Sequence, residues 1–391
     1  MASNARIQAY FKETVDGAET LKAACAEPQA AARVEDRAQA FSGAVFRNNL
    51  VSAAQDSLSG AIELLGTLLV LWAGFSLTEQ GVIGVGSLMT FYALLGYFTE
   101  PVKDLTGLQS AIQAAIAAAD RLNDVLDLHC EDTGAQQALP PRVECWSFRD
   151  VCFRYPGASE EDLSHISFQV KQGETLAIIG ATGSGKSTLV SLIPRFYDAT
   201  SGQVLVDGVD VKDYAFDALY DKLGYVTQKA VLFSGSIRDN VFFGESAAAA
   251  DDGALSSAIE LSQAKEFVDK LPEGTDHHIA QLGRNVSGGQ KQRLSIARAL
   301  ARKPEILVFD DSFSALDYRT DAKLREGLAK QLHDITKIIV AQRISTIRHA
   351  DKIIVLDRGE AVGMGTHEEL MQNCEVYREI ATSQLSAAEL A

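Results

Sequence analysis

Residues 175–196 read TLAIIGATGSGKSTLVSLIPRF. An apolar, β-rich run leads through a glycine-rich loop into a helical stretch, which is the strand–loop–helix order of a phosphate-binding loop. Glycines let the backbone wrap around phosphates, and the N–H groups at a helix start supply positive potential. The sequence therefore predicts a nucleotide-phosphate site formed by Gly180, Thr182, Gly183, Ser184, Gly185, Lys186, Ser187 and Thr188.

Carboxylates and a metal are expected beside this loop. Lys186 is predicted to reach the β- and γ-phosphates, and Ser187 to ligate Mg²⁺. The run ILVFDD (306–311) is a buried strand in pattern and delivers two aspartates to the edge of a sheet. We expect Asp310 to hold the metal through its water shell, and we examine Asp311 as the base that acts on the attacking water.

Two more side chains are candidates for the same site. Tyr155, in CFRYPG, is predicted to stack on adenine, and the alternative is an ordinary packing residue. Gln228 ends the apolar strand GYVTQ, where its amide is predicted to reach the metal or the attacking water. The alternative for Gln228 is a loop residue without such a role.

A second anion-binding helix start is predicted from NVSGGQKQRLSIARAL, which begins at Asn285. Its N–H groups and hydroxyl are expected to face an anion, through Ser287, Gly288, Gly289 and Gln290. One chain cannot easily aim two such helix starts at a single nucleotide, whereas a second copy of the domain can. The sequence therefore indicates that the site is completed between two chains.

The chain divides into parts of different character. From Val143, short β-rich runs alternate with helical stretches, which predicts an α/β domain with a largely parallel core sheet over 143–385. The stretch 131–142 contains glycine and two prolines without periodicity and is predicted to be a linker. Residues 386–391 are taken as a tail.

The first 130 residues are predicted to be all-α and to enter a membrane. Two apolar stretches, at about 57–78 and 81–99, are separated by a tight polar turn and predict a transmembrane helical hairpin. Only Glu63 interrupts the first stretch; the alternative is a pair of buried helices in a soluble domain. Residues 1–56 are expected to be helical with a break near Glu27 and Pro28, and the second span to continue as a long helix.

Composition limits the function classes. Of 391 residues, 36 are Lys or Arg and 52 are Asp or Glu, so the net charge of −16 argues against a nucleic-acid partner. No secretory signal is recognisable at the start of the sequence. The five cysteines show no CxxC spacing, which indicates reduced, cytosol-facing thiols rather than a disulfide framework or zinc site: Cys25, Cys130, Cys145, Cys152 and Cys374.

These motifs, in this order, resemble the ATPase domain of ATP-binding cassette (ABC) exporters. Their counterparts are Tyr155 (A-loop), GATGSGKST (Walker A), Gln228 (Q-loop), VSGGQ (signature), ILVFD (Walker B) and Ser314–Asp317 (D-loop). The resemblance implies an ABC-type α/β P-loop ATPase, with a mixed sheet and a helical subdomain, that binds ATP and Mg²⁺. It also implies a head-to-tail dimer in which each ATP lies between the Walker motifs of one chain and the signature of the other, with Asp317 among the nucleotide-binding residues.

The N-terminal part resembles the rear of an exporter's membrane domain. Residues 17–28 resemble the cytoplasmic coupling-helix region, and 97–128 resemble bacteriocin and competence-peptide exporters. Such half-transporters have six spans where two are predicted here, so a fragment lacking its front is one interpretation. The resemblance implies a multi-pass protein of a bacterial cell membrane with a cytoplasmic ATPase domain.

Two positions depart from the family pattern. Asp311 stands where the family usually has the general base Glu, and Gln342 where it has the switch-loop His. Asp is shorter than Glu by one methylene, about 1.5 Å, and Gln carries no proton charge. We therefore predict a catalytic set of Asp311, Gln342 and Gln228 that binds ATP but hydrolyses it poorly. The alternative is tolerated variation in a working enzyme.

The leading functional interpretation is one chain of an ATP-driven exporter, with a heterodimer favoured over a homodimer. Its signature would complete the competent site of a second half-transporter chain, and the bilayer and a transported peptide, lipid or drug-like substrate are the other partners. An alternative is a non-pumping regulatory partner that binds nucleotide. A soluble ATPase of DNA repair is disfavoured by the predicted hairpin.

Overall fold

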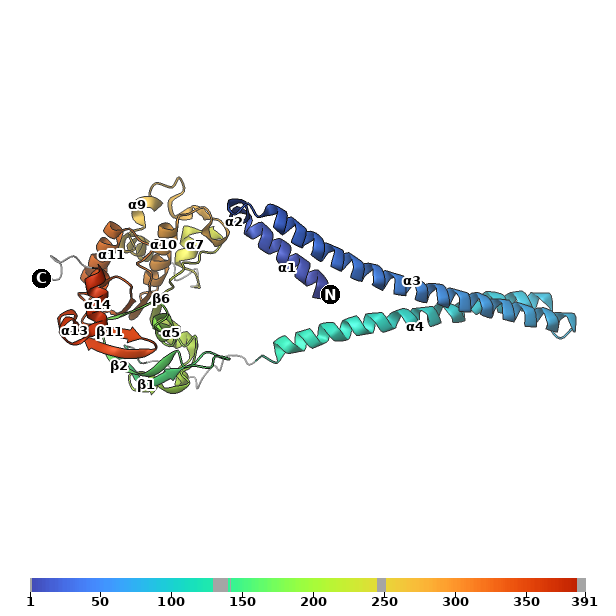
Figure 1. Cartoon of the computed structure of the whole chain (residues 1–391), viewed down its shortest axis with the longest axis horizontal. Coiled ribbons are helices and arrows are strands. Elements are labelled where there is room, and N and C mark those ends of the chain that lie inside the picture. Colours follow the sequence, from blue (N-terminus) through green and yellow to red (C-terminus); the bar gives the residue numbers. More distant parts are fainter. Residues whose placement is uncertain (1, 129–139, 141, 245–250, 385–391) are drawn as a thin grey trace. The chain divides into compact units, whose positions relative to one another are not determined.

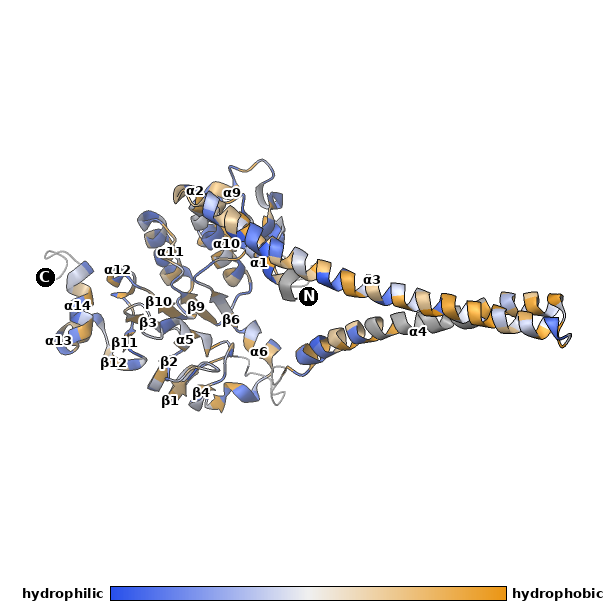
Figure 2. Cartoon of the chain, turned by 45° about the vertical axis from the view of Figure 1, so that its right-hand side comes forward, coloured by the Kyte–Doolittle hydropathy of each residue, from blue (hydrophilic) through white to orange (hydrophobic). Residues whose placement is uncertain are grey.

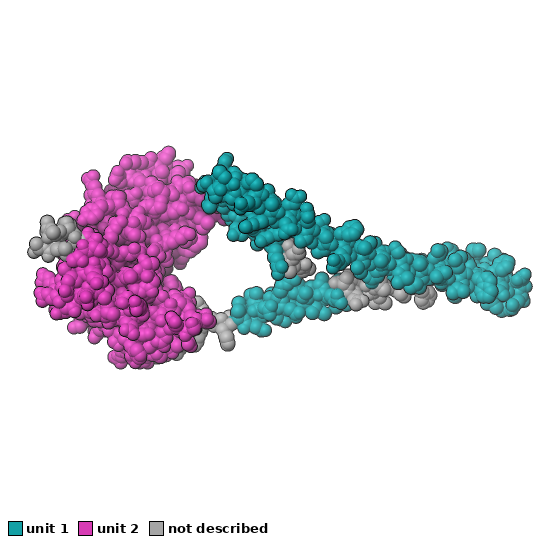
Figure 3. Space-filling view, viewed as in Figure 1, with its two compact units in different colours: residues 1–130 teal, residues 131–391 magenta. Residues whose placement is uncertain are grey.

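The computed structural model describes residues 2–128, 140, 142–244 and 251–384. The chain forms two compact units, residues 1–130 and 131–391 (Figure 3). The predicted linker, apart from residues 140 and 142, and the predicted tail lie outside the described residues.

The N-terminal unit is entirely helical in its described part. It consists of α1 (Ala2–Asp16), α2 (Ala18–Ala23), α3 (Glu27–Glu79) and α4 (Val85–Leu126) (Figure 1). The predicted break is confirmed: the chain leaves the helix between α2 and α3, and Pro28 lies in the first turn of α3. Proline fits there because its missing N–H would have no helical acceptor at that position.

Helices α3 and α4 pack against each other as a hairpin. A Cβ placed on Gly74 of α3 would lie 2.2 Å from Leu88 Cδ1 of α4, so glycine permits this close approach. Elsewhere α3 presents large apolar side chains to its surroundings; Trp72 is 74% exposed and Phe75 65%. Figure 2 shows hydrophobic residues along much of α3 and in the described part of α4 near the turn.

Only one of the two predicted spans meets the length of a bilayer crossing in the described residues. Helix α3 is long and apolar enough to cross a membrane, whereas the described apolar part of α4, Val85–Leu95, is shorter. The helix itself continues without interruption to Leu126, as the sequence predicted. The second span stays a prediction.

The C-terminal unit is built on a six-stranded sheet in the order β12-β11-β3-β10-β9-β6. Neighbouring strands are parallel except for the β11–β12 hairpin. The strands are β3 (Thr175–Gly180), β6 (Leu223–Val226), β9 (Ile306–Asp310), β10 (Thr336–Val340), β11 (Lys352–Asp357) and β12 (Glu360–Gly365). Because β3 and β9 run parallel on either side of β10, Gly180 and Asp310 end at the same edge.

Smaller sheets accompany this core. A four-stranded antiparallel sheet has the order β2-β1-β4-β5, and β7 pairs with β8. Their bounds are β1 (Cys145–Phe153), β2 (Leu163–Lys171), β4 (Ser201–Val206), β5 (Val209–Asp210), β7 (Gly235–Ser236) and β8 (His278–Ile279). The combination of parallel and antiparallel sheets confirms the predicted α/β class.

Helices cover both faces of the main sheet. They are α5 (Lys186–Ser191), α6 (Phe216–Asp221), α7 (Ile237–Val241), α8 (Asp252–Leu261), α9 (Lys265–Val268), α10 (Gly288–Ala301), α11 (Tyr318–Gln331), α12 (Ile344–Ile347), α13 (His367–Asn373) and α14 (Glu375–Gln384). Short 3₁₀ turns are η1 (Val211–Asp213), η2 (Gly274–Asp276) and η3 (Gln281–Gly283). Between β6 and α10 the regular elements of the described chain are mostly short helices and 3₁₀ turns.

Strand alternation divides the interior into two cores. In β3, Leu176 and Ile178 pack with α5 and the antiparallel sheet, whereas Ala177 and Ile179 pack with α10 and its neighbours. All four side chains are fully buried. A strand buried on both faces is apolar throughout, which is why this region lacks the polar alternation of a surface strand. This packing fixes the strand ends that carry the candidate site.

Candidate nucleotide site

The glycine-rich loop joins β3 to α5 in the predicted order. Gly180 has no space for a side chain, since a Cβ there would lie 2.1 Å from the backbone oxygen of Leu356. Gly185 has φ +94°, and a Cβ on it would lie 2.9 Å from the backbone oxygen of Asp162. Thr182 and Gly183 lie at the exposed tip of the loop. Gly180 and Gly185, where a side chain would clash, therefore set the path of the loop into the helix.

Lys186 is held inside this loop. It is 8% exposed, and its Nζ donates to the backbone oxygens of Gly180 (2.9 Å) and Ala181 (2.6 Å) and to Ser184 Oγ (3.3 Å). Burial lowers the pKa of Lys186, and the nearby carboxylates of Asp311 and Asp310 oppose that shift. The loop thus fixes a cation at its centre.

Ser187 and Asp310 meet although they are 123 positions apart in sequence. Ser187 Oγ donates to Asp310 Oδ1 at 2.9 Å. Burial raises the pKa of Asp310, and the charge of Asp311 adds to the rise, while hydrogen bonds from Ser187 and Tyr225 lower it. A hydroxyl and a carboxylate side by side form an oxygen-rich group of the kind that Mg²⁺ selects.

Asp311 is bound by both of the glutamines that the sequence singled out. Its Oδ2 accepts hydrogen bonds from Gln342 Nε2 (2.8 Å) and Gln228 Nε2 (3.1 Å). Asp311 is 6% exposed and has φ +46°, in the left-handed region that non-glycine residues rarely adopt. Burial raises its pKa, and the two amide donors act in the opposite direction. The three predicted catalytic residues therefore form one cluster.

Tyr155 lies in an aromatic group. Its ring contacts Phe153 (4.9 Å between centroids) and Tyr197 (5.2 Å), both edge to face. Its hydroxyl lies 3.2 Å from Thr188 Oγ1, at the start of α5. Tyr155 therefore packs against other aromatic residues, and these neighbours hold its ring beside the phosphate loop. This packing is compatible with the predicted stacking on adenine. Tyr197 was not predicted; it follows α5 in sequence and carries no motif that would single it out.

Tyr225 is a second residue that sequence reasoning missed. Its hydroxyl hydrogen-bonds to Asp310, and burial, followed by the charge of Asp310, raises the pKa of Tyr225. The residue lies in GYVTQ, three positions before Gln228, on the strand that pairs with β9. Only this pairing, which the sequence did not specify, shows that the phenol reaches the carboxylate.

The signature residues form a well-capped helix start. Ser287 is the N-cap of α10, and its side chain accepts from the backbone N–H of Gln290 at 3.3 Å. In return, Gln290 Oε1 accepts from the backbone N–H of Ser287 at 2.8 Å, which completes a capping box. Within the described residues, Ser287–Gln290 form no hydrogen bond with the phosphate loop. The anion site predicted at the start of α10 therefore shares no hydrogen bond with the phosphate loop of the same chain within the described residues.

Asp317 caps the next helix. Its carboxylate accepts from Thr320 Oγ1 (2.7 Å) and from the backbone N–H of Thr320 (3.0 Å). These hydrogen bonds lower the pKa of Asp317, which is fully exposed. Gly289 lies near this D-loop, since a Cβ on it would be 3.4 Å from the backbone oxygen of Ala315. The signature and D-loop thus lie side by side.

Comparison with known proteins places both parts of the chain in one family. Residues 163–314 match the ABC transporter family, and residues 1–102 match the ABC transporter transmembrane region. The ATPase domain of that family takes ATP as its substrate. The ordered motifs around Lys186 and Ser287 lie inside the first of these matches.

Individual relatives agree with this assignment. The putative multidrug export ATP-binding/permease protein YgaD of Bacillus subtilis is 34% identical over 97% of this chain and 66% of its own length. The uncharacterized ABC transporter ATP-binding protein YfiB of the same species is 42% identical over 81% of this chain and 55% of its own length. The ATP-dependent lipid A-core flippase of Xanthomonas campestris is 40% identical over 82% of this chain and 54% of its own length.

A solved structure has the same arrangement of elements. The structure of a bacterial Atm1-family ABC exporter with ATP bound superposes with a TM-score of 0.90 and 29% identity, over 98% of this chain and 68% of that chain. The present chain spans about half to two thirds of the length of the curated relatives named above. It therefore belongs to the ABC transporter family, and it joins part of the transmembrane region to the ATPase domain.

Proposed function

We propose that this chain is an ATP-binding, membrane-embedded subunit of a bacterial ABC exporter. Its ATPase domain would lie in the cytoplasm, and two spans would cross the cell membrane. Binding of ATP between two such chains would close the ATPase domains and move the membrane helices, with the region 17–28 as the coupling segment. The buried Lys186 in its glycine loop supports the ATP-binding part of this proposal most directly.

The oxygen atoms at the loop fit Mg²⁺. Ser187 Oγ and the Asp310 carboxylate lie together at 2.9 Å, and the Gln228 amide, whose Nε2 donates to the adjacent Asp311, would supply a further oxygen. These residues would hold the ion, which would neutralise phosphate charge when it is bound. Tyr225 would orient Asp310 through its hydroxyl. Tyr155 would provide the adenine contact from the aromatic group beside α5.

The site's own hydrolytic step is proposed to be impaired. Asp311 is shorter than the family's glutamate, and both Gln228 and Gln342 donate to the same oxygen, Oδ2. A carboxylate oxygen already engaged by two amides is a poor acceptor for the proton of an attacking water. Gln342 cannot carry the charge that a histidine can place near the γ-phosphate. The observation that carries this proposal is the 2.8 Å contact between Gln342 Nε2 and Asp311 Oδ2.

A partner chain would supply the productive site. The capping box leaves Ser287 exposed at the start of α10, with N–H groups of the first turn available to a phosphate. The signature would thus complete the partner's nucleotide site, whereas this chain's Walker residues would mainly hold ATP. This division of roles favours a heterodimer whose partner chain carries Glu and His at the positions equivalent to Asp311 and Gln342. A homodimer is the alternative.

The heterodimer proposal is tested with the full chain co-purified with such a partner in lipid nanodiscs. Ser287→Arg should lower ATP turnover about 100-fold, because it blocks the partner's site, which contains the working base. Asp311→Asn, the matched variant in this chain's own site, should change turnover by less than about twofold. If Asp311→Asn removes most of the turnover instead, Asp311 is a working base and the proposal is wrong.

A non-pumping regulatory subunit is the second candidate function. The same hydrogen bond between Gln342 and Asp311 favours it, because a chain that holds ATP without splitting it can gate another chain. Transport assays separate the two functions. An exporter chain is required in stoichiometric amount for transport, whereas a regulatory chain changes the rate of a partner that already transports alone.

The substrate class is proposed from the relatives. Their names describe multidrug export and lipid A-core flipping, which suggests an amphiphilic drug-like or lipid substrate. The resemblance of residues 97–128 to peptide exporters favours a peptide instead. Stimulation of ATP turnover by lipids, amphiphilic drugs and short hydrophobic peptides, measured side by side on the reconstituted dimer, distinguishes these classes.

A further inference from the structure

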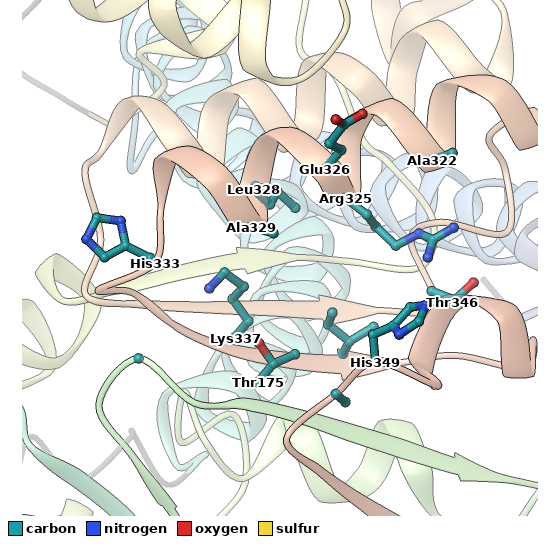
Figure 4. Close-up of a pocket in the computed structure, with 13 residues that line it drawn as sticks. Thr175, Ala322, Arg325, Glu326, Leu328, Ala329, His333, Lys337, Thr346 and His349 are labelled. Atoms are coloured by element: carbon teal, nitrogen blue, oxygen red, sulfur yellow. The ribbon is translucent and has the colours of Figure 1, made fainter. Parts of the chain in front are cut away.

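A cavity lies in the C-terminal unit, away from the phosphate loop. It has a volume of about 530 Å³ and is bounded by α11, the strands β3 and β10, and the segment around α12. Figure 4 shows α11 above and the strands below, with His333 and His349 on opposite sides. Its walls are largely apolar, formed by Ala322, Leu328, Ala329, Ile339 and Ala350. This size and lining are those of small-molecule pockets.

A buried ammonium group is the distinctive feature of this cavity. Lys337 is 6% exposed, and its side chain rises from β10 toward α11 (Figure 4). Its Nζ donates to the backbone oxygen of Ile335 at 3.0 Å. Over the described residues, that is the one hydrogen bond that the structure gives this ammonium, and no carboxylate lies within ion-pair distance of it. The other two N–H groups of this buried ammonium therefore have no acceptor among the described residues.

The other charges at the cavity are already matched. Arg325 donates from Nε to Asp321 Oδ1 at 2.9 Å and from Nη1 to the backbone oxygen of Ser345 at 3.0 Å. Glu326 accepts from Lys330 Nζ at 2.6 Å on the exposed side of α11. Asp351 accepts from the backbone N–H of Thr175 at 2.8 Å, and its negative charge acts on Lys337 from beyond ion-pair distance. Among the described residues, the positive charge of Lys337 thus has no ion-pair partner.

We propose that this cavity binds a small organic carboxylate with an apolar body, whose anionic group pairs with Lys337. A buried cation without a counter-ion is unfavourable, and a carboxylate within the cavity supplies both the charge and the missing acceptors. The apolar walls accept the rest of the molecule, so inorganic anions fit less well. The site lies at the opposite end of β3 and β10 from Gly180, and it is independent of the proposed function.

The proposal is tested by fluorine NMR on the full chain in lipid nanodiscs, with magnesium and excess ADP present to fill the phosphate loop. The probes are para-trifluoromethylbenzoate and its neutral analogue, para-trifluoromethylbenzyl alcohol. The carboxylate should bind at least about tenfold more tightly than the alcohol. Lys337→Met, which keeps the volume of the side chain, should remove that difference. Lys323→Met, at an exposed lysine of α11 that does not line the cavity, should leave it intact.

A second variant decides the case if Lys337→Met does not fold. Ala329→Phe fills the cavity from α11 without changing its charge, and it should abolish binding of both probes. Binding of the carboxylate that is equal in the wild type and in Lys337→Met, or that survives Ala329→Phe, contradicts the proposal. Absence of carboxylate binding to the wild-type chain at millimolar concentration also contradicts it.

Discussion

Asp311 brings an unusual backbone conformation and two amide donors to one carboxylate. Its φ of +46° places the side chain where Gln228 and Gln342 both reach Oδ2. Neither glutamine position predicts this contact by itself, because the two residues are 114 positions apart and lie after different strands. The sequence identified all three residues, but only the fold shows that both glutamines donate to the same oxygen of Asp311.

The pH dependence of stability follows from the burial of this group. The pKa of Asp311 is raised in the folded protein, so ionised Asp311 destabilises the fold at neutral pH and ceases to do so below its unfolded pKa of about 4. Asp311→Asn should therefore raise the free energy of unfolding at pH 7.5. The gain should shrink as the pH falls and be absent near pH 4. Calorimetry of the ATPase-domain transition measures it; a gain that does not change with pH contradicts this account.

Tyr225 is predicted to matter for metal-dependent nucleotide binding. Removing its hydroxyl with Tyr225→Phe takes one donor from Asp310, which costs about 1 kcal/mol and weakens magnesium-ATP binding about fivefold. Tyr214→Phe is the matched control, because its buried hydroxyl donates to the backbone oxygen of Val206 instead. Equal weakening of ATP binding with and without magnesium would show that Tyr225 does not act through the metal site.

At the scale of elements, the strand–loop–helix over 175–191 was predictable because glycines and an apolar run fix it locally. The break before α3 was predictable for the same reason, since proline constrains its own turn. The order of the strands in the sheet was not predictable from the sequence. Tyr225 and Asp310 meet only because β6 lies beside β9, and that pairing joins segments about 80 residues apart. The cavity beneath α11 also depends on this three-dimensional packing.

The capping box of α10 gives an element-scale prediction. Ser287→Ala removes the side-chain acceptor for the Gln290 N–H, and it should lower the free energy of unfolding by about 1 kcal/mol. Ser287→Thr keeps a hydroxyl and should recover most of that loss. Urea unfolding of the ATPase domain within the full chain measures both. No difference between Ser287→Ala and the wild type would mean that the cap does not support the helix.

For the whole molecule, the exposed apolar surface of α3 predicts dependence on a membrane. Leu65, Leu68, Leu69, Trp72 and Phe75 are each more than half exposed within the described residues. Surfaces of this extent mark contact with lipid or another protein. The purified chain should remain monodisperse in detergent or nanodiscs and aggregate when detergent is removed, as judged by size-exclusion chromatography. A monodisperse chain in plain buffer contradicts the membrane assignment of this hairpin.

The central claim is that this chain holds ATP at its own site but seldom splits it. The most direct measurement is phosphate release by the purified chain without any partner, compared with Asp311→Glu combined with Gln342→His. The account predicts slow release by the wild-type chain and a rate about 100-fold higher in the double variant, with similar ATP affinity in both. Wild-type release as fast as that of the double variant would contradict it.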